Sequence, residues 1–116
     1  MLLGIPSNVK VYFACELVDL RKGITGLCAI AEQTLHCNPS TGHLFVFIGK
    51  SKNKLKILFW DNNGFAIYFK RLERGRFQIP VINEQRSKIE IEATQLAMLL
   101  DGIDLNAKRL SRWQPT

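Results

Sequence analysis

Acidic side chains could carry metal-dependent chemistry, because enzymes that cut or join DNA commonly hold two metal ions between carboxylates. The candidates in this chain are Asp19, Asp61, Glu73, Asp101 and Asp104. Each has a simpler structural explanation. Asp19 stands where a helix N-cap is expected, and Asp61 ends a predicted strand at a turn. Glu73 lies among arginines, and Asp101 and Asp104 flank the end of a predicted helix. We therefore expect no catalytic residues and no enzymatic activity.

Cysteine and histidine form the second group of reactive residue types. The cysteines are Cys15, Cys28 and Cys37, an odd number without a CxxC pair, which argues against a disulfide framework and for a reducing, cytoplasmic environment. A zinc site built from Cys28, Cys37 and His36 is the weaker alternative, since these spacings match no structural zinc pattern. Phosphate-binding motifs such as GxGxxG and GxxxxGK[ST] are absent. We expect no bound metal and no cofactor.

Basic residues give the strongest signal. Between residues 43 and 76 the chain has eight basic and two acidic residues, so this stretch carries a charge of +6, which equals the net charge of the whole protein. A concentrated positive charge favours binding to nucleic acid or another polyanion, whereas a role in solubility alone is the alternative. The eight residues are Lys50, Lys52, Lys54, Lys56, Lys70, Arg71, Arg74 and Arg76.

Two aromatic residues, Trp60 and Tyr68, lie within the basic stretch. Flat rings beside cations suit phosphate contact combined with stacking on bases or sugars. The competing interpretation is that both rings form cross-strand pairs covered by a helix. With these alternatives open, the predicted nucleic-acid-binding set is Lys50, Lys52, Lys54, Lys56, Trp60, Tyr68, Lys70, Arg71, Arg74 and Arg76.

The turn at residues 62–64 decides which of these side chains share a face. A two-residue loop of Asn63 and Gly64 would mix lysines and phenylalanines on both faces. A three-residue loop, with Gly64 in the left-handed region, pairs Phe59 with Ile67. It places Lys54, Lys56, Trp60, Tyr68 and Lys70 on one face and the apolar residues on the other. Because a slip of one residue exchanges the faces, we predict the three-residue loop.

The chain as a whole predicts a single α+β domain over residues 1–105. We expect an antiparallel sheet of four to six strands with a central meander at 44–70, and two amphipathic helices packed on one face. Strands are predicted at 9–14, 44–48, 54–61, 65–70, 76–79 and 88–91. The helices are predicted from Asp19 to Leu35 and from Leu96 to Ile103, by apolar residues at helical spacing. A basic tail follows at 106–116, and one interpretation is that this tail is disordered.

Length and hydrophobicity fit this organisation. With 116 residues and 47% hydrophobic content, the chain is long enough for one core without disulfides. Its start has no basic region followed by an apolar stretch of signal-peptide length. Its longest apolar runs are about five residues, whereas a helix needs about 20 to cross a bilayer, so no membrane span is expected.

Five sequence strings carry a resemblance to a known family. They are DLRKGITGL (19–27), GHLFVF (42–47), KLKILFWDNNGF (54–65), YFKRLERGRF (68–77) and QLAMLLDGID (95–104). The chain resembles, over roughly residues 5–104, the small TnpB-type accessory protein encoded by the second open reading frame of the IS-sixty-six family of bacterial insertion sequences. The chain departs from the family pattern at Ile24-Thr25, where an aromatic-Asp pair is common. Glu92 replaces the usual Ser or Thr cap, which predicts a weaker start of the last helix.

The resemblance implies a protein that assists transposition beside a separate, large transposase. The family has no established catalytic residues, so none is carried over. The leading hypothesis is a non-enzymatic accessory protein that binds DNA, the transposase or both through a basic β-sheet face. The alternative is an adaptor that contacts only the transposase, and a metal-dependent nuclease is a distant third.

Overall fold

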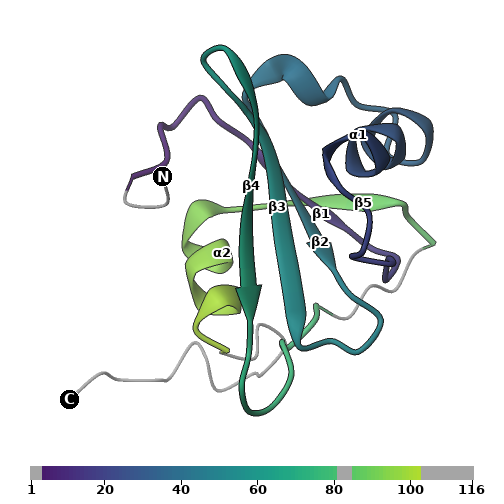
Figure 1. Cartoon of the computed structure of the whole chain (residues 1–116). Coiled ribbons are helices and arrows are strands. Elements are labelled where there is room, and N and C mark those ends of the chain that lie inside the picture. Colours follow the sequence, from purple (N-terminus) through teal and green to yellow (C-terminus); the bar gives the residue numbers. More distant parts are fainter. Residues whose placement is uncertain (1–3, 81–84, 103–116) are drawn as a thin grey trace.

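A mixed five-stranded sheet is the centre of the fold (Figure 1). The structure, a computed structural model, describes residues 4–80 and 85–102. The sheet order is β4-β3-β2-β1-β5, and the strands are β1 (Val11–Ala14), β2 (Leu44–Ile48), β3 (Lys54–Asp61), β4 (Gly64–Arg71) and β5 (Lys88–Ile91). The predicted single α+β domain is confirmed. Of the predicted strands, 76–79 does not form.

The sheet is not wholly antiparallel, which corrects one part of the prediction. Strands β1 and β2 are parallel neighbours, and the other three pairings are antiparallel. Helix α1 (Ile24–Gln33) and the short 3₁₀ helix η1 (Pro39–Thr41) lie between β1 and β2 in the chain. A strand, a crossover helix and a second strand in the same sheet normally give parallel pairing, so the order of elements already contained this signal.

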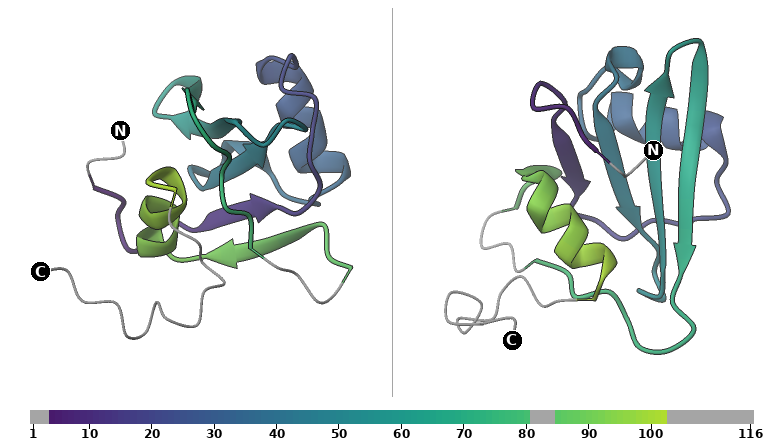
Figure 2. Two further views of the ribbon diagram at one scale, coloured as in Figure 1. Left: turned by 90° about the horizontal axis from the view of Figure 1, so that it is seen from below. Right: turned by 90° about the vertical axis from the view of Figure 1, so that its left-hand side faces the viewer.

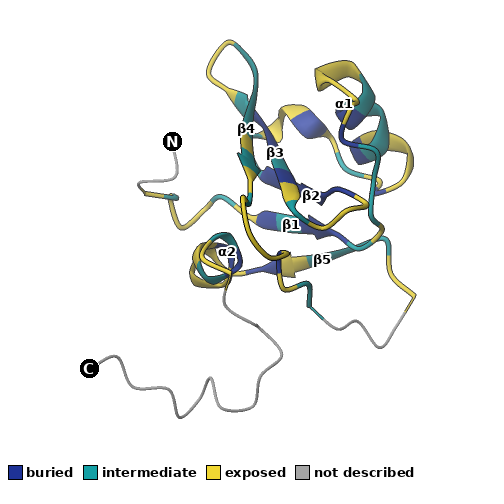
Figure 3. Cartoon of the chain, turned by 60° about the horizontal axis from the view of Figure 1, so that its bottom comes forward, coloured by how far each residue is buried: buried dark blue, intermediate teal, exposed yellow. Residues whose placement is uncertain are grey.

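The two helices lie on opposite faces of the sheet, so the prediction that both pack on one face was wrong (Figure 2). Leu27 and Ala31 of α1 pack with Phe45, Phe47 and Leu58. Helix α2 (Ala93–Leu100) covers the other face, where its residues Leu96 and Leu99 pack with Val11, Phe13, Val46, Ile48 and Ile57. All five residues of β2 are buried, as its unbroken apolar sequence LFVFI indicates for a strand covered on both faces (Figure 3).

The β3–β4 hairpin has a register that differs from the predicted one. Asp61 pairs with Gly64 and Trp60 with Phe65, so the loop has two residues, Asn62 and Asn63. Asn62 takes the left-handed conformation, with φ of 59°, which asparagine tolerates better than most residues. The prediction of a three-residue loop assumed one apolar and one polar face. Because helices cover both faces, both faces contain apolar residues, and this assumption fails.

Helix α1 begins later than predicted, at Ile24, with Gly23 as N-cap in place of Asp19. The Val18 N–H donates to the Ile48 carbonyl oxygen, so the chain still follows the sheet at this point. Helix α2 is capped through its first turn, since the Gln95 side-chain oxygen accepts from the Glu92 N–H at 2.7 Å. Glu92 therefore completes a capping box, and the expected weakening at this position is compensated.

No described helix has the length and apolar character needed to cross a membrane. The predicted tail at 106–116 and the candidate carboxylate Asp104 lie outside the described residues.

Candidate functional site

An open groove of about 760 Å³ lies on the face of the sheet that α1 covers, at the end of the β3–β4 hairpin remote from its turn. Among the described residues, five basic side chains and one carboxylate line it, a net charge of +4. The lining residues are Val18, Asp19, Leu20, Arg21, Gly49, Lys50, Ser51, Lys54, Lys56, Phe69 and Arg71. We call this the basic groove. Three separate parts of the chain supply it: residues 18–21, the 49–51 turn and the β3–β4 hairpin.

The β3–β4 register brings two pairs of side chains together in the basic groove. Lys54 is the cross-strand partner of Arg71, and Lys56 is the partner of Phe69. Directly opposed residues of antiparallel strands project on the same face, so these four side chains lie side by side. Lys54 and Arg71 are exposed, and Phe69 is 50% exposed although it is a large apolar residue. Sequence reasoning missed Phe69, because the predicted register put it on the core face.

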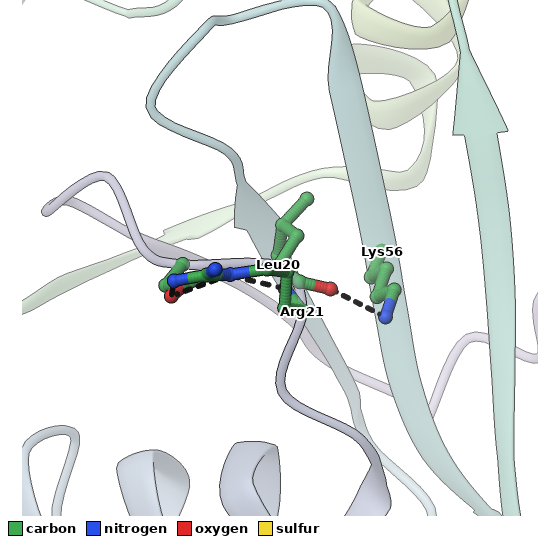
Figure 4. Close-up of polar contacts among 4 residues, drawn as sticks. Leu20, Arg21 and Lys56 are labelled. Atoms are coloured by element: carbon green, nitrogen blue, oxygen red, sulfur yellow. Dashed lines mark hydrogen bonds and ion pairs between the residues drawn. The ribbon is translucent and has the colours of Figure 1, made fainter.

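Lys56 connects the sheet to the segment before α1 (Figure 4). Its Nζ donates to the Leu20 carbonyl oxygen at 2.7 Å and to the Lys22 carbonyl oxygen at 3.1 Å. It also lies 5.8 Å from the centroid of the Phe69 ring, within cation–π range. Lys56 thus forms one wall of the groove, but most of its hydrogen-bonding capacity is used within the protein.

Two ion pairs modulate the charge of the groove. Arg21 Nη2 lies 2.7 Å from Asp19 Oδ2, and Arg71 Nε lies 2.9 Å from Glu73 Oε2. The hydrogen bonds from the Arg21 side chain and N–H hold the pKa of the Asp19 carboxyl well below its usual range. Both pairs are solvent-exposed and therefore weak, so an incoming anion can compete with the carboxylates for the guanidinium groups.

Six of the ten predicted residues do not line the basic groove, and four of these six are Lys52, Trp60, Arg74 and Arg76. Lys52 and Arg76 line a second, smaller hollow of about 300 Å³ together with Phe77, and Arg74 is exposed at the turn that Gly75 makes with φ of 76°. Trp60 projects on the same face as Lys54 and Lys56 but is half-buried, with its ring 5.0 Å from that of Phe65 in an edge-to-face contact. Trp60 and Phe65 thus form a cross-strand aromatic pair.

Tyr68 and Lys70 project on the opposite face of the sheet, which corrects the predicted shared face. Their cross-strand partners are Ile57 and Leu55, both buried under α2. Tyr68 packs against that core, and the Nζ of Lys70 donates to the Leu100 carbonyl oxygen at 2.8 Å. Lys70 therefore satisfies a carbonyl at the C-terminal end of α2, a role that the one-residue difference in register concealed.

The described residues contain no group of three or more His, Cys, Asp or Glu side chains that could hold a metal ion. Asp61 is exposed at the end of β3, and Asp101 is the C-cap of α2. The three cysteines are free thiols, and burial raises the pKa of Cys15 and Cys28. Thiols with a raised pKa are poor nucleophiles and poor metal ligands at neutral pH.

Comparison with known proteins places the chain in a family. Residues 9–110 match the family described as IS66 Orf2 like protein. The chain belongs to this family. The resemblance found in the sequence strings is thereby confirmed, and family membership supports a role as a transposition-associated accessory protein of an insertion sequence.

Two full-length relatives come from Sinorhizobium fredii strain NGR234. The uncharacterized protein y4hO is 39% identical over 97% of this chain and 96% of its own length. The uncharacterized protein y4jC is 28% identical over 99% of this chain and 97% of its own length. No solved structure matches the chain. The family assignment therefore indicates the biological context of the protein, and the basic groove is its candidate binding site.

Proposed function

We propose that this IS66 Orf2-like protein is a non-enzymatic accessory factor that binds the phosphate backbone of DNA in its basic groove during transposition. The observation that supports this proposal most directly is the cross-strand pair of Lys54 and Arg71, both of which are exposed. Lys50 and Arg21 line the same groove. Cations supplied by neighbouring elements at one open site suit an extended polyanion better than a small ligand.

The chemistry of the groove supports binding rather than catalysis. Asp19, the one carboxylate among the described residues that line it, is paired with Arg21 and cannot hold two metal ions alone. Phosphate contacts made by flexible lysine and arginine side chains position a protein on DNA without reading its sequence. The separate transposase is the expected protein partner of the complex, and its own contacts with DNA would then supply sequence specificity.

Binding of a fluorescent DNA duplex by the whole chain, measured at increasing salt, tests the proposal. A site that neutralises about three or four phosphates should give a steep linear fall of log affinity with log salt. The double variant Lys54→Gln/Arg71→Gln should make that slope shallower by about two phosphate contacts. A matched variant, Lys10→Gln/Arg74→Gln, removes the same charge from exposed positions outside the groove and should retain most of the slope.

Absence of duplex binding at low salt would contradict the proposal. Capture of the transposase by a chain that binds no DNA would then favour the adaptor hypothesis. Equal losses in the two double variants would show that net charge, rather than the groove, controls binding.

A further inference from the structure

Strand β4 is an edge of the sheet with an unusual composition. Its first six residues, Gly64–Phe69, include no charged residue and no proline. Each of the eight residues of the strand is either exposed or intermediate in burial. Soluble proteins normally protect long edges with charges, prolines or bulges, because free backbone groups pair readily with another strand. The exposed Phe69 adds apolar area to the same edge.

The hydrogen-bonding direction along β4 follows from one contact at its end. The Leu72 N–H donates to the Asn53 carbonyl oxygen at 2.7 Å, in line with the β3–β4 register. In an antiparallel pair, alternate residues point their backbone groups at the neighbouring strand. The even-numbered residues of β4 therefore bond to β3. The backbone groups of Phe65, Ile67, Phe69 and Arg71 point away from the sheet, at an edge where no other described strand pairs with β4.

We infer that β4 pairs antiparallel with β4 of a second copy of this chain, about a two-fold axis at Ile67. This arrangement sets Ile67 opposite itself and Phe69 of one copy opposite Phe65 of its partner, so that both pairs of aromatic rings become cross-strand neighbours. It joins two five-stranded sheets into one of ten strands and covers the apolar edge.

Charge favours an antiparallel, self-complementary pairing. The basic residues of β4, Lys70 and Arg71, stand at one end of the strand, and the turn that carries Asp61 stands at the other. Antiparallel pairing separates the two basic ends and places each beside the acidic turn of the other copy. Parallel pairing would bring four cations together. A two-fold axis perpendicular to the sheet also keeps both basic grooves on the same side of the ten-stranded sheet.

Mass in solution, measured by light scattering without DNA, tests this inference independently of the proposed DNA binding. The full chain should reach twice its 13.2 kDa mass as concentration rises. Phe69→Lys should abolish the dimer, since an edge lysine opposes pairing. Thr94→Lys adds the same charge to an exposed position of α2 and should leave the dimer intact. Circular dichroism would show that both variants keep the fold.

Cysteine cross-linking tests the register in a chain whose three native cysteines are replaced by alanine. Ile67→Cys should give a disulfide-linked dimer on oxidation, because residues at the axis lie within disulfide distance of their partners. Phe65→Cys should not, since its two copies would stand about 13 Å apart along the strands. The inference would be overturned if the wild-type chain stayed monomeric at every concentration or if the Phe69→Lys variant still formed a dimer. It would also be overturned if cross-linking occurred at position 65 in place of position 67.

Discussion

The ammonium group of Lys56 lies 2.7 Å from the Leu20 carbonyl oxygen, so that a side chain of β3 holds the segment that precedes α1. This contact has two consequences. It occupies backbone carbonyls that no helical N–H reaches, since α1 begins only at Ile24. It also brings Asp19 and Arg21 to the end of the sheet beside the 49–51 turn, where they complete the basic groove.

Replacement of Lys56 by methionine should destabilise the fold by about 1–3 kcal/mol, because two carbonyl acceptors lose a charged donor. Urea unfolding measures this change. The control is Lys54→Met, which changes an exposed lysine on the same strand and should alter stability by less than about 0.5 kcal/mol. Equal effects of the two substitutions would show that the Lys56 contacts do not stabilise the fold.

Lys70→Met should weaken the C-terminal end of α2 by about 1 kcal/mol, because the Leu100 carbonyl loses a charged donor at the negative end of the helix. Hydrogen exchange provides a local measurement. The Asp101 N–H, which donates to the Ala97 carbonyl oxygen, should exchange faster, whereas amides in α1 should not change. An unchanged Asp101 rate would mean that Lys70 contributes little to the helix end.

Glu73→Gln should strengthen DNA binding by about two- to fivefold, the range expected when an exposed ion pair no longer competes for Arg71. The salt dependence should steepen at the same time. Glu90→Gln serves as the control, because it removes the same charge from an exposed position on β5, at the opposite edge of the sheet. A similar gain in both variants would indicate a general effect of net charge.

The Asp19 carboxyl should titrate below the ordinary value of 3.8, since Arg21 stabilises its charged form. A pKa lowered by folding means that the pair favours the folded state above about pH 4 and loses this contribution as the pH falls below it. Carboxyl chemical shifts measured by NMR across an acid titration give the pKa. Arg21→Gln should return it toward 3.8. An unshifted wild-type value would mean that the pair does not persist in solution.

Paired core substitutions test the two-sided arrangement of the helices. Leu27→Ala and Leu99→Ala should each destabilise the chain by about 2–5 kcal/mol, since both side chains are fully buried, on opposite faces of the sheet. Unfolding by urea would measure both. A cost near zero for either substitution would show that the helix carrying it does not cover its face of the sheet.

The sequence by itself determined the elements and the charge. Strands such as β2 and β3 follow from local runs of β-branched and aromatic residues, and the concentration of lysines and arginines is a matter of composition. The family could also be recognised from short strings, and residues 9–110 confirm it. These properties depend on neighbouring residues, so no tertiary information was needed.

Only the tertiary structure decided which side chains meet. Helices on both faces remove the polar face on which the register prediction relied, and a shift of one residue then exchanges Tyr68 and Lys70 for Phe69 and Arg71 beside the lysines of β3. Arg21 joins the groove through the contacts of Lys56 with a segment about 35 residues earlier in the chain. Such long-range packing cannot be deduced from local periodicity, because it depends on how separate elements cover one another's surfaces.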